Sequence, residues 1–255
     1  MNYKAKSTAA RRKVLEMIHK GHTSHIASNF SVIDIATVLY DKLQKGDEVV
    51  WSKGWASATI YYFLAQQGKI PVEDIDKFAQ EENGEIRYLG LAETTTPGVL
   101  CNGGSVGHGL PIAAGIAIAK KRAGEKGTVY CIMSDGEMNE GSVWEAVMFA
   151  SHHKLNNLVA IIDKNGWQAM GKTDDVMKIN LLRAFFGFGW SVANINGHSF
   201  EKIEQSLRFF HGNKPLAIIA NTVKGKGVSF MENHLLYHYK HVSDEDYQKA
   251  LEELV

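Results

Sequence analysis

Two stretches of sequence decide the fold: TVYCIMSDGE at residues 128–137 and NLVAIIDKNG at residues 157–166. Each is a short run of apolar and β-branched residues that ends in polar residues and glycine, which is typical of a buried strand followed by a turn. Two similar runs follow, WSVANI at 190–195 and PLAIIANTV at 215–223. Helical patterns separate the four runs, at roughly residues 140–154, 177–187 and 199–211. This alternation predicts a doubly wound α/β fold with a mainly parallel sheet and helices on both faces.

Composition limits the classes of function. The chain has 255 residues, and its 28 basic and 28 acidic side chains give a formal net charge of zero. A neutral chain excludes binding to nucleic acid or to an anionic membrane driven by net charge. The longest apolar stretch, Leu110 to Ala119, is too short to span a bilayer. We therefore expect a globular protein with no membrane partner and no nucleic-acid partner.

The organisation of the chain favours one domain. No Pro/Ser-rich linker or charge block divides it, so we predict a single domain over residues 1–255. Ser243 precedes an acidic first turn and a helical apolar period, which predicts a C-terminal helix over 243–254. The two cysteines, Cys101 and Cys131, show no metal-ligand spacing and no disulfide framework, which favours a reducing cytoplasm.

A further helix is expected to begin at Ser31. Ser31 and Asp34 have the spacing of a capping box, and Ile35, Val38 and Leu39 follow at helical period. This pattern predicts that the Ser31 side chain caps the first turn.

The ends of the first two strands carry a candidate metal site. Asp135 and Asn165 are thirty residues apart, about the length of one strand, crossover helix and strand. Both side chains are therefore expected at the same edge of the sheet, where ligands bind in such folds. Carboxylate and amide oxygens suit Mg²⁺ or Ca²⁺, which completes its shell with water and phosphate oxygens. Gly136 would let a phosphate approach the main chain.

These motifs resemble the transketolase family. SDGEMNEG at 134–141, VWEA at 143–146, HKLNNL at 153–158 and DKNG at 163–166 look like its thiamine-diphosphate signature. The resemblance extends over nearly the whole chain, through RRKVLEMIHKGHTSHIASNFSVIDI, SKG at 52–54, GGSVGHGL at 103–110 and VKGKG at 223–227. It matches only the amino-terminal, diphosphate-binding half of a full-length transketolase, as in the split-subunit members.

The resemblance assigns roles to cofactor-binding residues. It implies that the cofactor is thiamine diphosphate, with a divalent ion held by Asp135, Asn165 and the carbonyl of Trp167. It places Gly136 and Glu137 against the diphosphate. Further carry-over puts Lys224 and His238 near the diphosphate or the reacting end, and Gly104 and Val106 beside the pyrimidine.

Catalysis and assembly are implied in the same way. His25 matches the early active-site histidine of the family, His238 is its expected partner in moving protons at sugar hydroxyls, and Glu140 matches an acid in a proton network across a subunit contact. The implied activity is transfer of a two-carbon ketol unit between small sugars or sugar phosphates. The pyrimidine-binding half is missing, so a second subunit carrying it and an α2β2 heterotetramer are expected.

The sequence departs from the family on the substrate side. Trp55 stands in Ser-Lys-Gly-Trp where the family has a histidine that usually reaches the cofactor phosphate. Other departures concern Ile26 to Asn29, Gly90-Leu91-Ala92, Ser134 and Tyr237-His238-Tyr239. These changes leave the donor and acceptor sugars open.

Two alternatives remain. Residues Gly166 to Thr173 fit the P-loop pattern after a predicted strand, which would indicate a nucleoside triphosphatase. A non-catalytic transketolase-like partner subunit is the second alternative, and Trp55 is its best support. Binding of ATP with Mg²⁺ and not of thiamine diphosphate would indicate the triphosphatase. Absence of ketol transfer by the assembled subunits would indicate the non-catalytic partner.

Overall fold

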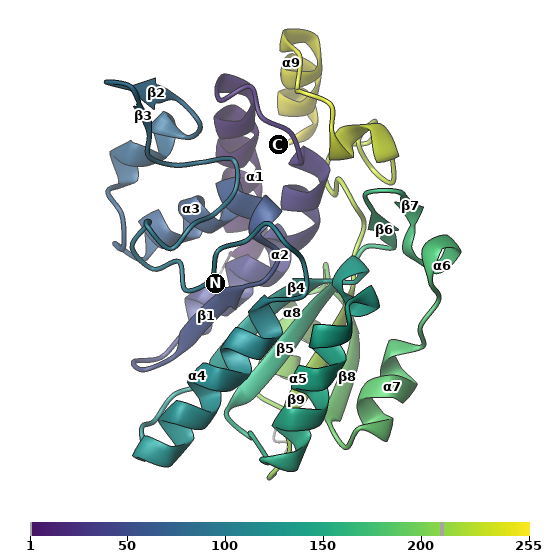
Figure 1. The fold of residues 1–255 in the computed structure, drawn as a ribbon. Helices are drawn as coiled ribbons and strands as arrows, with labels where there is room; N and C mark the ends of the chain where they lie inside the picture. Colours follow the sequence, from purple (N-terminus) through teal and green to yellow (C-terminus); the bar gives the residue numbers. More distant parts are fainter. Residues whose placement is uncertain (1, 210–211) are drawn as a thin grey trace. The chain divides into compact units, whose positions relative to one another are not determined.

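The structure is a computed structural model that describes residues 2–209 and 212–255 (Figure 1). The chain forms two compact units. The helical unit lies within Met1–Tyr40, Gly54–Gly104 and Val223–Val255, and the sheet unit comprises Asp41–Lys53 and Ser105–Thr222. The single domain expected over residues 1–255 stays a prediction.

The sheet unit is built on five parallel strands in the order β1-β4-β5-β9-β8. The four predicted runs are all strands: β4 (Val129–Ser134), β5 (Leu158–Lys164), β8 (Ser191–Asn196) and β9 (Leu216–Asn221). The parallel α/β architecture predicted from their alternation with helices is therefore confirmed. Sequence analysis missed the edge strand β1 (Glu48–Trp51), because four residues beginning with an acidic side chain give too short a pattern.

Helices flank this sheet. In Figure 1, α4 (Gly109–Ala123) and α5 (Gly141–His152) run next to each other, and α4 packs on β1, β4 and β5. The helix expected over 177–187 is α7 (Leu181–Gly187), which begins later because Asn180 caps it by accepting from Arg183 N. The pattern expected over 199–211 is α8 (Phe200–Leu207), and residues 210 and 211 lie outside the described residues.

The helical unit contains nearly all of helix α2 (Ile26–Lys42), in which Ile26 through Tyr40 are all buried. Its buried polar side chains, such as Asn29 and Asp34, are satisfied by hydrogen bonds or an ion pair. Helix α1 (Tyr3–Lys20) packs on α3 (Ser57–Gln66) and on α9 (Asp244–Glu253), where Ser243 caps α9 by accepting from Asp246 N. The shorter elements are η1 (Gly54–Ala56), η2 (Val72–Lys77), β2 (Glu81–Glu82), β3 (Glu85–Ile86) and η4 (Leu235–His238). No helix within the described ranges is both long and apolar enough to cross a membrane.

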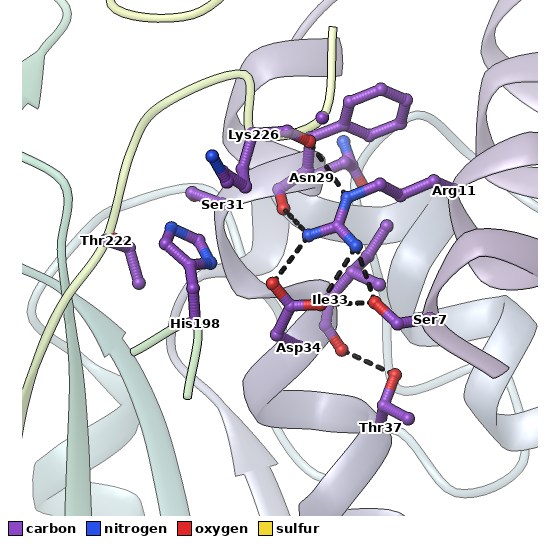
Figure 2. Close-up of polar contacts among 12 residues, drawn as sticks. Ser7, Arg11, Asn29, Ser31, Ile33, Asp34, Thr37, His198, Thr222 and Lys226 are labelled. Atoms are coloured by element: carbon purple, nitrogen blue, oxygen red, sulfur yellow. Dashed lines mark hydrogen bonds and ion pairs between the residues drawn. The ribbon is translucent and has the colours of Figure 1, made fainter. Parts of the chain in front are cut away.

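The helix start predicted at Ser31 is wrong. Helix α2 begins at Ile26, and the Ser31 hydroxyl donates to Ser28 O inside the helix. Asp34 does not cap, because its carboxylate forms a buried, bidentate ion pair with Arg11 at 2.8 and 2.9 Å (Figure 2). The Arg11 Nε donates to Lys226 O at 2.8 Å, so this pair also fastens the VKGKG loop to α1. The Ser31–Asp34 spacing therefore matches a capping box by coincidence, because the role of Asp34 is its ion pair with Arg11.

Candidate functional site

The strand ends bring Asp135 and Asn165 to one edge of the sheet unit. Strands β4 and β5 are paired in register, with Ser134 opposite Asp163. Asp135 Oδ2 accepts hydrogen bonds from Gly166 N at 2.8 Å and from Thr173 Oγ1 at 3.1 Å. The Asp135 carboxylate therefore reaches the turn that starts at Asn165, as the thirty-residue spacing predicted.

Asp135 keeps one oxygen without a protein partner. Its residue is 2% exposed, and Oδ1 is buried with no hydrogen-bond partner among the described residues. Burial, and next the negative charge of Asp163, raise the pKa of Asp135 to about 6. A buried carboxylate oxygen with no donor is costly unless a cation or water satisfies it. This oxygen fits a hard divalent cation.

The rest of the donor set at this edge is amide and main chain. The side-chain oxygen of Asn165 accepts from Trp167 N at 3.0 Å, which orients the amide within the turn. No three His, Cys, Asp or Glu side chains of residues 2–209 and 212–255 cluster as a metal site. A cation here would therefore depend on a mixed set of carboxylate, amide and carbonyl oxygens, which is the chemistry that Mg²⁺ and Ca²⁺ accept.

Glu137 lies inside the sheet unit rather than at its surface. It is completely buried, and its carboxylate accepts from Ser52 Oγ, from Gly107 N at 3.2 Å and from the Ser134 amide at 2.9 Å. Burial raises its pKa, and these hydrogen bonds oppose the rise. The carboxylate thus ties the end of β1 and the Gly107 turn to the end of β4. Contact of Glu137 with a diphosphate stays a prediction.

A buried ion pair between Lys53 and Asp163 lies at the same edge of the sheet. Lys53 Nζ contacts Asp163 Oδ2, and Thr222 Oγ1 donates to the other oxygen, Oδ1. Lys53 and Asp163 are both buried. Sequence analysis missed this pair, although both residues lie in the quoted SKG and DKNG motifs, because no spacing rule connects the end of β1 to the end of β5.

Gly136 and Glu140 occupy the turn between β4 and α5. Gly136 lies close to Gln168, and an added Cβ would stand 3.0 Å from the Gln168 Cβ. Any larger residue here would crowd the turn. Glu140 is exposed at the N-cap of α5, and its expected role in a subunit contact stays a prediction.

The P-loop alternative is wrong. Residues Gly166 to Thr173 form a tight antiparallel hairpin of β6 (Trp167–Gln168) and β7 (Gly171–Lys172). The helix that follows, α6 (Thr173–Val176), has only four residues. A P-loop needs an open backbone cradle that leads into a long helix N-terminus. The threonine of the pattern instead donates to Asp135.

The helical unit brings the two predicted catalytic histidines together. The rings of His25 and His238 lie with centroids 4.8 Å apart, and His25 N donates to His238 O at 3.1 Å. Lys224 is completely buried, and its Nζ lies 2.5 Å from His238 Nδ1. Ser24 Oγ lies 2.7 Å from His25 Nδ1, a contact that the sequence did not indicate. Three distant segments therefore meet in one polar and aromatic cluster.

Gly104 and Val106, the two residues expected beside the pyrimidine, belong to different units. In the helical unit, Gly104 O accepts from the Trp55 indole at 3.3 Å, and an added Cβ on Gly104 would stand 2.9 Å from Leu91. In the sheet unit, Val106 is an exposed apolar side chain in the glycine-rich turn before α4. Their contacts with a cofactor stay predictions.

Comparison with known proteins places this architecture in a family. A family model for the thiamine diphosphate binding domain of transketolase matches residues 3–254. The chain is 35% identical to an apulose-4-phosphate transketolase subunit of Phocaeicola vulgatus, over 96% of this chain and 90% of that relative. It is 33% identical to the 6-deoxy-6-sulfo-D-fructose transketolase subunit SqwG of a Clostridium species, over 96% and 93%.

A solved structure agrees with these relatives. The transketolase of Campylobacter jejuni superposes with a TM-score of 0.92 at 29% sequence identity. The superposition covers 100% of this chain but 43% of that longer chain. Human transketolase is likewise matched over 42% of its length, at 30% identity. The chain therefore belongs to the transketolase family, as a thiamine-diphosphate-binding domain of that family.

Proposed function

We propose that this chain is the N-terminal subunit of a two-subunit transketolase-type enzyme. The enzyme moves a two-carbon ketol unit from a ketose to an aldose, using thiamine diphosphate and a divalent cation. The observation that carries the proposal is the buried, unpartnered Oδ1 of Asp135 beside the Asn165 turn. The whole chain, residues 1–255, would serve as one diphosphate-binding domain.

The sheet unit would hold the diphosphate end of the cofactor. Asp135, Asn165 and the Trp167 carbonyl would bind Mg²⁺ or Ca²⁺, and the ion would bind diphosphate oxygens. Gly136 and the main chain of Glu137 would lie against the diphosphate, because Gly136 has no side chain to keep it away. The bound cofactor supplies the nucleophilic carbon that accepts the two-carbon unit.

The helical unit would move protons at the sugar. His25 and His238 lie in contact, so one imidazole can receive a proton from a sugar hydroxyl while the other orients it. Lys224 places a cation beside His238, which suits an anionic diphosphate or phosphate nearby. Gly104 and Val106 would flank the pyrimidine, and Glu140 would act at the subunit contact.

A second subunit would complete the enzyme. Two of the relatives named above are called subunits, and this chain spans less than half the length of the two one-chain transketolases. The sheet unit also exposes large apolar side chains on α5, α6 and α7, among them Met148, Phe149, Val176, Leu182 and Phe186. An apolar surface of this kind is typical of a partner interface. We therefore propose an α2β2 assembly with a pyrimidine-binding subunit, located in the cytoplasm.

The substrates would be small sugars or sugar phosphates. The names of the relatives include a phosphorylated and a sulfonated sugar, so substrate choice varies among similar subunits. Trp55 lies next to His25 and supports a specialised substrate range.

The experiment is a ketol-transfer assay of this chain copurified with its pyrimidine-binding partner. Activity should require both thiamine diphosphate and Mg²⁺, and Asp135→Asn should abolish it. The matched control, Asp175→Asn, changes an exposed carboxylate in α6 and should leave activity intact. A wild-type complex that binds cofactor but transfers no ketol unit would favour the non-catalytic partner instead.

A further inference from the structure

Trp55 lies next to a close crossing of two backbone segments. It lies in η1 directly after Gly54, whose backbone crosses that of Gly103 so closely that an added Cβ would stand 2.2 Å from Gly103 Cα. The same close approach limits Gly103 in return. The crossing therefore has no room for a side chain at either glycine, and Trp55 follows it directly in the chain.

The indole of Trp55 contacts two predicted site residues. Its ring stacks on the His25 imidazole, with centroids 4.6 Å apart and an interplanar angle of 15°. Its Nε1 donates to Gly104 O at 3.3 Å. One side chain thus connects the expected catalytic histidine to the loop expected beside the pyrimidine.

A buried amide joins the main chains of the same two residues. Asn29 Nδ2 donates to His25 O at 3.0 Å and to Trp55 O at 3.4 Å. Its Oδ1 accepts from the Thr59 amide and hydroxyl at 3.0 and 2.9 Å. Asn29 is 1% exposed, so these bonds are shielded from water. Trp55 and His25 are therefore joined twice, by the Asn29 hydrogen bonds to their main chains and by the stacking of their rings.

The backbone of His25 is strained. Its φ angle is +69°, a left-handed conformation that is unfavourable for a residue with a side chain. Such strain persists only where surrounding contacts fix it, and it gathers at functional sites. The stacked indole restrains the imidazole about its side-chain torsions, while Ser24 and His238 restrain it from other sides.

We propose that Trp55 is a positioning residue: its stacked, hydrogen-bonded indole fixes the plane of the His25 imidazole and the place of the Gly104 loop. The inference rests on the proposed function, because it assigns His25 the proton transfer. Trp55 stands where the family has a histidine, so the exchange gives this position a positioning role. An ionisable side chain is replaced by an aromatic ring system that stacks on His25 and remains 39% exposed.

The first test does not need turnover. In the full chain labelled with ¹³C in its histidine rings, protons of His25 should resonate upfield, because they lie over the indole face. His25→Asn identifies the resonance. Trp55→Leu should remove the upfield shift, and Trp55→Phe should keep a large part of it. Equal His25 shifts in wild type and Trp55→Leu would overturn the proposal.

The second test separates positioning from substrate contact. In the complex with the partner subunit, Trp55→Leu should lower kcat by roughly tenfold to a hundredfold, because misplacing a reacting group by about 1 Å is costly. The KM for the ketose should change less than about threefold, and Trp55→Phe should restore most of kcat. A raised KM with unchanged kcat would overturn the proposal. Absent turnover in the wild type would count against the proposed function alone, and the resonance shift would still decide the role of Trp55.

Discussion

The sheet unit and the helical unit build their parts of the candidate site in opposite ways. In the sheet unit, Asp135 and Asn165 follow paired neighbouring strands, so regular topology alone brings them together. In the helical unit, His25, Trp55 and His238 come from three separate segments. Trp55 stacks on His25, a buried amide bonds the main chains of these two residues, and the His238 ring contacts the His25 ring edge-on. The first arrangement follows from strand order, and the second depends on the packing of segments that are far apart in the sequence.

The direction of the pKa shift separates the two buried carboxylates at the strand ends from carboxylates that sit in stabilising pairs. Burial raises the pKa of Asp135 and Glu137 in the sheet unit, so the folded chain there disfavours the charged form of both carboxylates. In the helical unit, the hydrogen bond from Tyr88, and then Lys77, lower the pKa of Asp74. Raised carboxylate pKa values without full compensation are typical of ligand sites, whereas lowered values are typical of stabilising pairs.

The largest expected effect concerns the sheet unit. Thiamine diphosphate with Mg²⁺ should raise the melting temperature of the complex, because ligand binding to the native state stabilises it. Asp135→Asn should abolish that rise. Without cofactor, the variant should melt no lower than wild type, because a buried carboxylate with an unpartnered oxygen is replaced by a neutral amide. Differential scanning fluorimetry measures both, with Asp175→Asn as control.

A different melting temperature of the Asp135→Asn variant would contradict the contrast between the sheet unit and the helical unit. An apo Asp135→Asn chain that melts far below wild type would show that Asp135 is a structural residue. The sheet unit would then lose its distinction as the part shaped for a ligand.

The next effect concerns the helical unit. His25→Ala should lower kcat by roughly 10²–10⁴-fold, the range expected for loss of a proton-transfer group. Stabilisation by thiamine diphosphate and Mg²⁺ should persist, because His25 is not among the residues proposed to hold the metal or the diphosphate. Steady-state kinetics and a melting curve with cofactor test the two halves of this statement. Loss of cofactor stabilisation in His25→Ala would contradict the division of labour.

A third effect is on stability. Lys53→Met leaves Asp163 buried without its cation and should lower the free energy of unfolding by about 3–5 kcal/mol. The double variant Lys53→Met with Asp163→Asn should regain much of the loss, because the uncompensated charge is gone. Urea denaturation followed by circular dichroism measures both. A single variant as stable as wild type would mean that the pair does not support the strand ends.

The smallest effect is the acid sensitivity of the helical unit. The pKa of Asp74 is lower in the folded chain than in the unfolded chain, so its contribution is present above its unfolded pKa and fades as the pH falls through its folded pKa. Wild type should therefore lose more stability than Asp74→Asn as the pH falls from about 5 to 3. Melting curves across that range, parallel for the two proteins, would refute this role.

The sequence predicted the parts that depend on short patterns. Apolar runs located four of the five sheet strands, and the interval between Asp135 and Asn165 predicted their meeting, since a crossover of that length returns the chain to the same edge. The sequence missed β1, because four residues carry too little pattern. It also misplaced the start of α2, because Asp34 pairs with Arg11, a partner that only tertiary structure reveals.

The helical part of the site depended on resemblance and on coordinates. Nothing in the spacing of His25 and His238 indicates contact, and the family resemblance alone suggested it. The stacking of Trp55 and the clamp by Asn29 follow from packing of separate segments, which no local rule encodes. Sequence alone showed Trp55 only as a departure, whereas the structure gives it partners.

The most direct measurement is an anomalous difference map from crystals of the assembled enzyme grown with thiamine diphosphate and Mn²⁺ in place of Mg²⁺. The account predicts one manganese peak bound by Asp135 Oδ1, the Asn165 side-chain oxygen and the Trp167 carbonyl, with diphosphate oxygens completing its shell. A cofactor bound with its metal away from Asp135 and Asn165 would contradict it.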